Sequence, residues 1–200
     1  MRLSKQIQRL ALTIALTGLW TAAACMGPSP QVQYYTLAPL AAEERGAAWD
    51  GAALLAVGPV SLPKVLDRPH MATQSGDNRV VFAETHRWAG SLQEEIARVV
   101  ADNLSILLNS DQIIATSDEG LSVPGHRIII NIQRFIAQPN GEVVLELLWT
   151  LKQSGREQSS VLQKSTIRRP LESPGYDGIA AAQSAALGDL SREMAAYIRR

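Results

Sequence analysis

The sequence lacks several features that would assign it to a familiar class of protein. It has one cysteine in 200 residues, so no disulfide bond can form within the chain. Outside its N-terminal segment it has no apolar run approaching the roughly 18 residues that a transmembrane helix needs. It has no excess of basic residues, because Lys and Arg number 19 and Asp and Glu also number 19. The charge balance argues against nucleic acid as a partner, since binding phosphates needs a basic patch.

Motifs of enzyme active sites are also absent. The sequence has no G-x-S-x-G nucleophile elbow, no H-E-x-x-H pair, no phosphate-binding glycine loop and no dinucleotide fingerprint. Its three histidines, His70, His86 and His126, lie far apart and lack the short spacings of zinc ligands. Glu94 and Glu95 are adjacent on a predicted helix, where neighbouring side chains point about 100° apart. The sequence therefore predicts a protein that is not an enzyme and that holds no metal.

The first 24 residues have the pattern of an export signal. Arg2, Lys5 and Arg9 make a positive leader, residues 10–20 (LALTIALTGLW) are largely apolar, and residues 21–24 are small. This order of a charged region, a short apolar core and a small-residue cleavage site is typical of a secretory signal peptide. The apolar core is too short to span a bilayer stably. We expect residues 1–24 to be removed.

The one cysteine follows this signal directly. The run Ala22-Ala23-Ala24-Cys25 resembles a bacterial lipobox, in which a diacylglyceryl group is attached to the thiol and the cysteine becomes the new N-terminus. Ala22 stands where lipoboxes usually carry Leu, and the alternative is an ordinary signal peptide followed by a cysteine by chance. We expect Cys25 to carry covalent lipid and the protein to have no other cofactor. Met26, rather than an aspartate, follows Cys25, which favours the outer membrane over retention at the inner one.

The remaining 176 residues have the length of one domain. The leader holds three of the 19 basic residues and none of the acidic ones, so residues 25–200 carry 16 basic and 19 acidic groups, a formal charge of −3. Residues 26–33 (MGPSPQVQ) are rich in Pro, Gly, Ser and Gln and are typical of a tether. We therefore divide the chain into a signal peptide (1–24), a lipidated tether (25–33) and a single domain (34–200).

The domain begins with short strands and then a helix. Strands are predicted at residues 34–37, 54–62, 70–74 and 79–83, the second interrupted at Gly58-Pro59 because proline is unsuited to the middle of a ladder. Ser91 and Glu94 form a capping box that predicts a helix start. Apolar residues then recur at helical spacing and predict one buried face: Leu92, Ile96, Val99, Val100, Leu104, Leu107 and Leu108. Asn103 lies inside this stripe, as a hydrogen-bonded core residue or at the stripe's edge.

The second half repeats the pattern of strands followed by a helix. Strands are predicted at residues 113–117, 127–138, 142–153 and 161–167, the middle two joined by a hairpin through Asn140-Gly141. A last helix is predicted over residues 179–199, entered through Ser173-Pro174 or Asp177. The predicted fold is α/β: a single domain with a mixed, largely antiparallel sheet and two main helices packed on it. Each helix has one apolar face, so the other side of the sheet should be thinly covered or open to solvent.

Several segments together carry a resemblance to a known family. They are YYTL at 34–37, VGPVSLP at 57–63, LDRP at 66–69, and Arg87-Trp88 followed by Leu92 at the start of the helix that contains Asn103-Leu104. In this order behind a lipobox, the chain resembles the ABC-type transport auxiliary lipoproteins, the PqiC-like (YmbA) family. Gly90-Ser91 departs from the acidic residue and proline expected there, although Ser91 preserves the helix cap.

The resemblance implies an outer-membrane lipoprotein that serves an MCE-type lipid transport system. In such a system an inner-membrane complex sends a hydrophobic tunnel across the periplasm, and the lipoprotein receives or docks its tip. The implied partners are the periplasmic MCE-domain protein, the outer membrane and lipid itself. A homo-oligomeric ring is implied if the partner is a symmetric multimer. The chain has no nucleotide site, so another subunit would supply the energy.

Three residues of these segments are candidate partner-binding residues: Arg68, Arg87 and Trp88. The alternative is that they brace the fold, with the tryptophan at a core edge and Asp67 and Arg68 in a local salt bridge. A second function also stays open, that of a generic periplasmic scaffold for secretion or envelope assembly. Neighbouring genes for an MCE-domain protein, a permease or an ATPase would favour the transport function.

We expect the mature protein to begin at acylated Cys25. Intact-mass analysis of the membrane fraction should give the mass of residues 25–200 plus acyl chains, because two or three chains together hold a protein on a membrane. The variant Cys25→Ser should leave the membrane fraction. A soluble product that starts at another residue, or unchanged fractionation of Cys25→Ser, would contradict this assignment.

Overall fold

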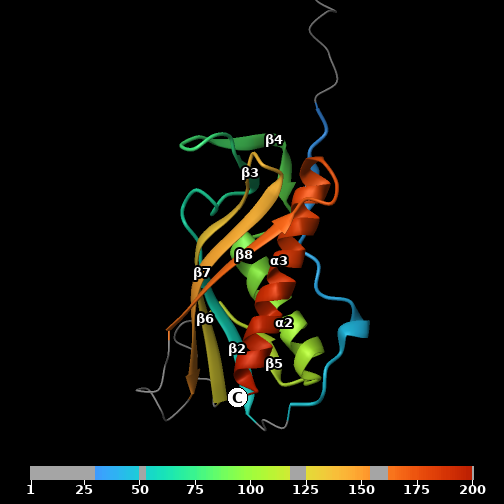
Figure 1. Ribbon diagram of the computed structural model, residues 1–200, viewed down its shortest axis with the longest axis vertical. Helices are drawn as coiled ribbons and strands as arrows, with labels where there is room; N and C mark the ends of the chain where they lie inside the picture. The colour runs from blue at the N-terminus through green and yellow to red at the C-terminus, as the bar shows by residue number, and fades with distance from the viewer. Residues whose placement is uncertain (1–29, 50–52, 118–124, 154–161, 200) are drawn as a thin grey trace, which may run out of the picture. The chain divides into compact units, whose positions relative to one another are not determined.

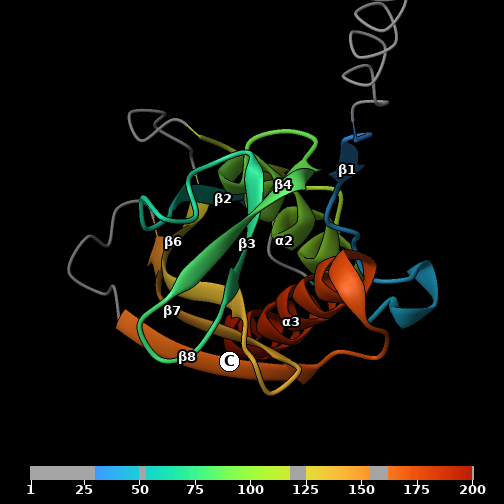
Figure 2. The same ribbon diagram turned by 90° about the horizontal axis from the view of Figure 1, so that it is seen from above.

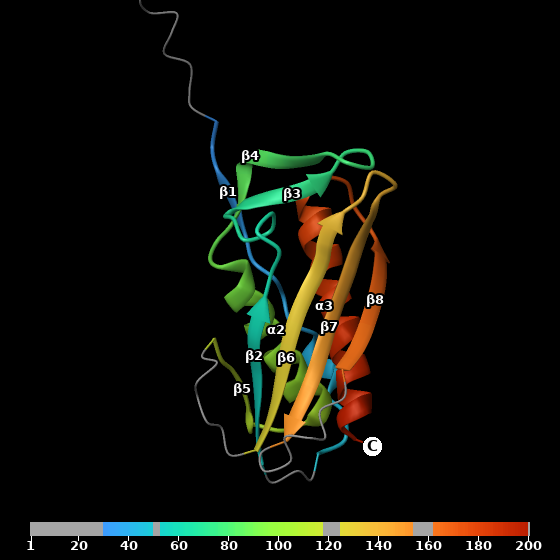
Figure 3. The same cartoon turned by 90° about the vertical axis from the view of Figure 1, so that its left-hand side faces the viewer.

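A computed structural model describes residues 30–49, 53–117, 125–153 and 162–199 of the chain. The predicted signal peptide and Cys25 lie outside these residues. Residues Val32–Arg200 form one compact unit, in which one mixed sheet is covered on one face by two long helices (Figures 1 and 3). The predicted fold class is thereby confirmed. No helix in the described part of the chain is long and apolar enough to cross a membrane.

The order of elements is strands, helix, four strands and helix, as predicted. The elements are β1 (Gln33–Tyr35), η2 (Ala42–Glu44), β2 (Leu54–Ser61), β3 (His70–Gln74), β4 (Val80–Trp88), α2 (Leu92–Leu108), β5 (Ile113–Ala115), β6 (Gly125–Ala137), β7 (Glu142–Gln153), β8 (Leu162–Pro170) and α3 (Gly175–Ile198). Three boundaries differ from the prediction: β4 continues to Trp88, β5 stops at Ala115, and α3 begins at Gly175 with Pro174 as its N-cap. The short 3₁₀ turn η2 was not predicted.

The sheet is mixed in strand direction. Its strands lie in the order β1-β4-β3-β6-β2-β5, and β7 and β8 extend it from the other edge of β6. The two longest ladders, β6–β7 and β7–β8, are antiparallel, as is β3–β4. The pairs β1–β4, β2–β5, β2–β6 and β3–β6 are parallel. Seen from above, β3 and β4 cross over one end of the longer strands (Figure 2).

The hairpin between β6 and β7 is confirmed, but with a different turn. Only Gly141 has a positive φ, of 77°, whereas the sequence suggested that Asn140 would share it. The amide of Gly141 donates to the carbonyl of Gln138, and the amide of Gln138 donates to the carbonyl of Glu142. One glycine is therefore enough to reverse the chain here.

Strand β7 alternates between the core and the open face of the sheet. Its inward residues Val143, Leu145, Leu147 and Trp149 are at most 1% exposed. The indole Nε1–H of Trp149 donates to Ser165 Oγ on β8 at 3.0 Å, so burial leaves no unpaired donor. The outward side is mixed, and the figure shows no helix over it (Figure 3). This confirms a sheet buried on one side.

Helix α2 lies on the sheet through the face that the sequence predicts. Ser91 is its N-cap, and the side chain accepts a bond from the amide of Glu94 at 3.5 Å. The apolar residues of this face are buried: Leu92, Ile96, Val99, Val100, Leu104 and Leu108. The helix ends at Asn109 in the left-handed conformation, with a φ of 47°. Asparagine is among the few residues that tolerate this end geometry.

Asn103 is the hydrogen-bonded core residue that the sequence analysis considered. It is fully buried, and its Oδ1 accepts from the amide of Leu40 at 2.7 Å. Its Nδ2 donates to Ser191 Oγ on α3 at 3.2 Å. The side chain thus joins three segments that are far apart in sequence: the loop after β1, helix α2 and helix α3.

Strand β2 passes through Gly58-Pro59 as one continuous element, where the sequence suggested an interruption. The register against β6 shifts between Val57 and Val60, so a bulge absorbs the proline. Gly58 has a φ of 122°, and a Cβ placed there would lie 1.9 Å from the carbonyl oxygen of Thr116. The close approach of the chain after β5 therefore requires glycine at this position.

Because α2 holds the core together, its two kinds of residue should differ in their effect on stability. Leu104→Ala should lower the free energy of unfolding by about 2–5 kcal/mol, from lost burial plus the cavity left behind. Ser91→Ala should cost about 1 kcal/mol or less, because it removes only a long capping bond. Denaturant titration of both variants checks this, and the opposite ranking would mean that the buried face is misassigned.

The backbone geometry at Gly58 gives a second stability prediction. Gly58→Ala should destabilise the protein by more than about 3 kcal/mol, since the new methyl group meets Thr116 at a φ that only glycine tolerates. Gly76→Ala is the matched control, with a φ of 76° and no atom within 4 Å of the added carbon. It should cost only about 1–2 kcal/mol. Equal losses in thermal or denaturant unfolding would contradict the steric argument.

Candidate functional site

Three of the segments singled out in the sequence meet at one end of the sheet. The amide of Trp88 donates to the carbonyl of Pro69 at 2.7 Å, which joins the end of β4 to the loop before β3. The amide of Ala89 donates to the carbonyl of Tyr35 at 2.8 Å, which joins the same place to β1. Figure 3 shows β1, β3 and β4 together at this end. We call this region the β1–β4–β3 end.

One row of side chains crosses the outer surface of this end. Tyr34 on β1 is in register with Arg87 on β4, which is in turn in register with His70 on β3. Residues in register project from the same face of a sheet. Tyr34 is 65% exposed, while the neighbouring residue Tyr35 is buried on the opposite face. The row therefore presents a phenol, a guanidinium and an imidazole on the outside of the domain.

Trp88 is not part of this outer surface. Its side chain is 4% exposed and belongs to the hydrophobic core. A buried indole cannot contact a partner without unfolding the strand that holds it, so the partner-binding role considered for Trp88 is wrong. Its role is to brace the junction between β4 and α2.

Arg68 is exposed in the loop before β3, and its guanidinium carbon lies 4.8 Å from the ring centroid of Phe82. A cation–π contact at an exposed site contributes about 0.5–1 kcal/mol. No ion pair joins Asp67 to Arg68, although both residues are described, so the expected local salt bridge is wrong. Arg68 is held over an aromatic ring with its charge uncompensated by a carboxylate.

Arg87 is half-buried and also has no carboxylate partner among the described residues. Its Nε is buried without a hydrogen-bond partner in that part of the chain. A buried donor left unpaired costs about 1–3 kcal/mol, so this group gains from any acceptor brought to it. Arg68 and Arg87 are thus two cations on one end of the domain that are free to meet an acidic surface.

Behind the outer row lies an aromatic cluster. The Tyr35 hydroxyl is 2.8 Å from His86 Nδ1 and 2.8 Å from Gln33 Oε1. The His86 ring stacks on Tyr176 of α3, with centroids 4.0 Å apart. Burial, together with nearby Asp177 and Tyr176, raises the pKa of the Tyr35 phenol, so the hydroxyl keeps its proton and acts as a donor. The cluster ties β1 and β4 to the start of α3.

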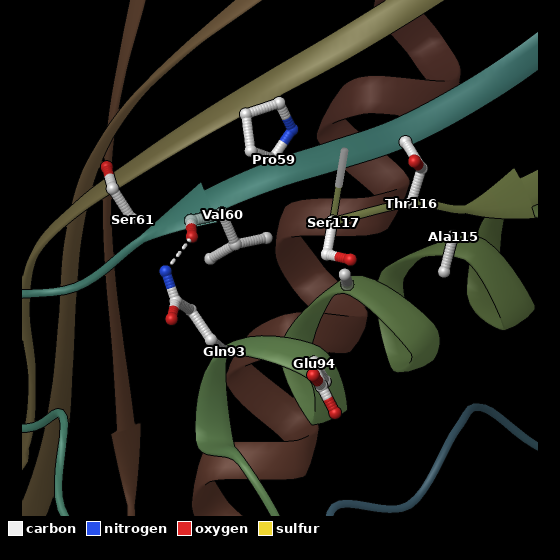
Figure 4. Close-up of a pocket in the computed structure, with 9 residues that line it drawn as sticks. Pro59, Val60, Ser61, Gln93, Glu94, Ala115, Thr116 and Ser117 are labelled. Carbon is white, nitrogen blue, oxygen red and sulfur yellow. Dashed lines mark hydrogen bonds between the residues drawn. The ribbon is translucent and has the colours of Figure 1, made fainter. Parts of the chain in front are cut away.

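A pocket of about 410 Å³ lies between β2, the first turn of α2 and the end of β5 (Figure 4). Pro59, Val60 and Ser61 form one wall, and the pocket continues over Gln93, Glu94, Ala97, Ala115, Thr116 and Ser117. Gln93 Nε2 donates to the carbonyl of Val60, which occupies this exposed strand edge. Glu94 is the one charged residue of the lining, so the pocket offers no nucleophile with an adjacent base.

The residues considered for catalysis or metal binding do not converge. Glu94 lines the pocket, whereas Glu95 pairs with Arg98 at 2.8 Å and accepts from the amide of Leu37. His70 lies on the outer row and His86 in the aromatic cluster. His126 lies beside Trp49, with ring centroids 5.9 Å apart. Within the described residues no group of three or more His, Cys, Asp or Glu side chains could hold a metal ion.

The pocket and the outer row were not predicted from the sequence. The segment at 57–63 was noted only for its resemblance, and nothing local indicated that β5 would end early and leave a cavity beside it. The outer row depends on β1 pairing in parallel with β4, some fifty residues along the chain. Long-range pairing of this kind leaves no local pattern. Exposure of Tyr34 beside buried Tyr35 follows from strand alternation alone.

Known proteins resemble this chain in sequence. Two proteins named intermembrane transport lipoprotein PqiC, from Escherichia coli (strain K12) and Shigella flexneri, are each 24% identical to it over 147 residues. The matched region is 72% of this chain and 74% of each relative.

Solved structures resemble it in fold. A crystal structure of an uncharacterized protein matches with a TM-score of 0.69 and 21% identity, covering 84% of this chain and 99% of that one. A Xanthomonas campestris protein of the DUF330 family matches with a TM-score of 0.65 and 17% identity, covering 84% and 95%. At these identities the structures show the fold alone. A family model described as the ABC-type transport auxiliary lipoprotein component matches residues 35–195, and the chain belongs to this family.

Proposed function

We propose that the protein is a lipid-anchored, non-catalytic subunit that docks the periplasmic part of an MCE-type transport complex at the outer membrane. The observation that carries the proposal is the meeting of the 34–37, 66–69 and 87–88 segments at the β1–β4–β3 end. The name of the PqiC relatives, intermembrane transport lipoprotein, supports a transport role in the cell envelope.

The anchor is the lipid proposed on Cys25, which fixes the protein at the membrane surface. Met26 in place of an aspartate supports the outer membrane, with the body on the periplasmic side. The predicted tether of residues 25–33 then keeps the domain within a short distance of that surface.

The proposed contact with the partner uses Arg68 and Arg87. Neither has a carboxylate partner among the described residues, and both lie at the same end of the domain. An acidic patch on the MCE-domain protein would supply acceptors for both guanidinium groups, including the unpaired Nε of Arg87. Electrostatic contacts of this kind set the orientation and rate of docking.

A weak contact is sufficient for such a subunit. Because the lipid confines the protein to a surface, a second binding event there has a high effective concentration. Several copies would gather in a ring around the tip of a symmetric partner. A non-catalytic role is supported by the composition of the pocket, whose lining holds a single charged residue. Energy for transport would come from another subunit.

The test is affinity capture of the full lipoprotein, tagged at its C-terminus and extracted from membranes in mild detergent. We expect recovery of an MCE-domain protein. Arg68→Glu should reduce that recovery by at least about ten-fold, because reversing one charge of a close pair costs about 2–5 kcal/mol. Arg87→Gln should reduce it in the same direction and keeps the polar volume of the half-buried site.

The matched control is Arg45→Glu. Arg45 is exposed and donates to Asn109 Oδ1 near the C-terminus of α2, away from the β1–β4–β3 end. It makes the same change in net charge and should leave recovery unchanged. Recovery of secretion or wall-assembly proteins in place of an MCE-domain protein would favour the scaffold function. Equal loss in Arg45→Glu would contradict the proposed contact surface.

A further inference from the structure

Exposed apolar side chains gather at the β1–β4–β3 end. Among the described residues, seven large apolar side chains are at least 36% exposed. Five of them belong to this end: Val32, Tyr34, Val65, Val80 and Val81. We call these five the apolar end. The other two, Ile114 and Leu162, lie on β5 and β8.

The five side chains belong to the three segments that meet there. Val32 and Tyr34 lie at β1, Val65 lies in the loop before β3, and Val80 and Val81 begin β4. All three views place β3 and β4 together at one end, and Figure 3 places β1 beside them. Clusters of exposed apolar side chains mark interaction surfaces, whereas single ones need no explanation.

These residues are not poorly packed core. On β4 the core begins at Ala83, which is 5% exposed, and on β3 at Met71, which is 1% exposed. Val80 and Val81 lie beyond both, paired with Gln74 and Thr73 next to the turn. The hairpin therefore carries two valines past the limit of the core, where they meet solvent or another surface.

The charge of this end differs from that of the rest of the molecule. Residues 62–88 hold four basic side chains, Lys64, Arg68, Arg79 and Arg87, and three acidic ones. Their formal charge is +1, whereas residues 25–200 as a whole carry −3. The apolar end is thus the part of the surface least opposed to a layer of anionic headgroups.

The chain that precedes this end connects it to Cys25. Seven residues separate Cys25 from Val32. At about 3.3–3.6 Å for each fully extended residue, the tether reaches at most roughly 25 Å. Of the described elements β1 is the first in the chain, so the lipid on Cys25 holds this end closer to the bilayer than its tether allows any other end to be.

We propose that the apolar end rests in the headgroup region of the bilayer that holds the lipid of Cys25. The proposal depends on the anchor in the proposed function and is independent of the MCE partner. Tyr34 is suited to this depth, because a tyrosine ring is apolar and its hydroxyl remains hydrated, and tyrosine is enriched at membrane interfaces. The four valines lie in the apolar boundary just beneath.

A protein partner is the competing occupant of this surface. Protein interfaces concentrate their energy in buried Trp, Tyr and Arg anchors, whereas four of the five residues here are valines. The short tether favours the bilayer, since that surface is present at all times and within reach. In this orientation Arg68 and Arg87 also lie near the membrane, which is where a conduit for lipid has to end.

The test places a fluorescent probe at the surface of the intact lipoprotein. Acylated Cys25 has no free thiol, so an introduced cysteine is the only site for an environment-sensitive label such as NBD. Tyr34→Cys and Val81→Cys report on the apolar end. Ile114→Cys and Leu162→Cys are matched controls, because both are exposed apolar residues on strands outside it. Each labelled protein is reconstituted into vesicles of phosphatidylethanolamine and phosphatidylglycerol that contain a nitroxide-labelled lipid.

The nitroxide lipid should lower the emission of the probes at positions 34 and 81 by about two-fold or more, because they lie at the headgroup depth. The probes at 114 and 162 should change little. Flotation of the same vesicles measures the anchor independently. Protein that floats but shows no difference between the two pairs of probes would overturn the membrane contact and leave the proposed function intact. Protein that does not float would overturn both.

One further outcome is distinguishable. If the surface binds a second copy, the probes at 34 and 81 will quench one another in lipid-free detergent as protein concentration rises. That result, with no effect of the nitroxide lipid, would also overturn the membrane contact.

Discussion

The structure depends on burial of a single face of a long, twisted sheet under two helices. Helix α2 contributes the aliphatic residues, which at about 25 cal/mol for each Å² of apolar surface make the largest favourable contribution to folding. Helix α3 contributes mostly alanines and lies close to both α2 and β8, with Leu187, Leu190 and Met194 fully buried. Because the helices cover one face only, every other surface of the domain is available for contacts. The fold is in this sense a platform with one side committed.

Much of this arrangement could be predicted from sequence, because the strongest signals are local. The start of α2 follows from Ser91 and its stripe of aliphatic residues, and the hairpin follows from Asn140-Gly141 between two alternating runs. The parts that were missed depend on distant contacts. Strand β4 extends to Trp88 because β1 pairs with its end, and the bulge at Gly58-Pro59 lets β2 continue where proline alone suggested a break. The 3₁₀ turn η2 is held by Glu44, which pairs with Arg192 on α3.

The candidate site was predicted in part. The segments at 66–69 and 87–88 were noted by resemblance, and the structure brings them together with β1. Their individual roles needed the structure: Trp88 is buried, and Arg68 stacks on Phe82 where a salt bridge with Asp67 was expected. Neither distinction can be read from the letters alone, because Arg-Trp and Asp-Arg have the same sequence whether they face the core, each other or solvent. The same is true of the pocket beside Val60, which exists only because β5 ends at Ala115.

The segment that follows β1 bears on how the domain withstands mechanical force. A lipid anchor and a periplasmic partner attached to one molecule can pull in opposite directions, and the load would enter through β1. It would pass next to residues 37–40, whose backbone is held by the side chains of Glu95, Ser184 and Asn103. These bonds come from both helices, and Arg98 adds a further one to the carbonyl of Leu37. Several bonds loaded together resist separation better than bonds broken in sequence. The anchored end of the domain is thereby riveted to the helices, and tension at the membrane is shared by the whole fold.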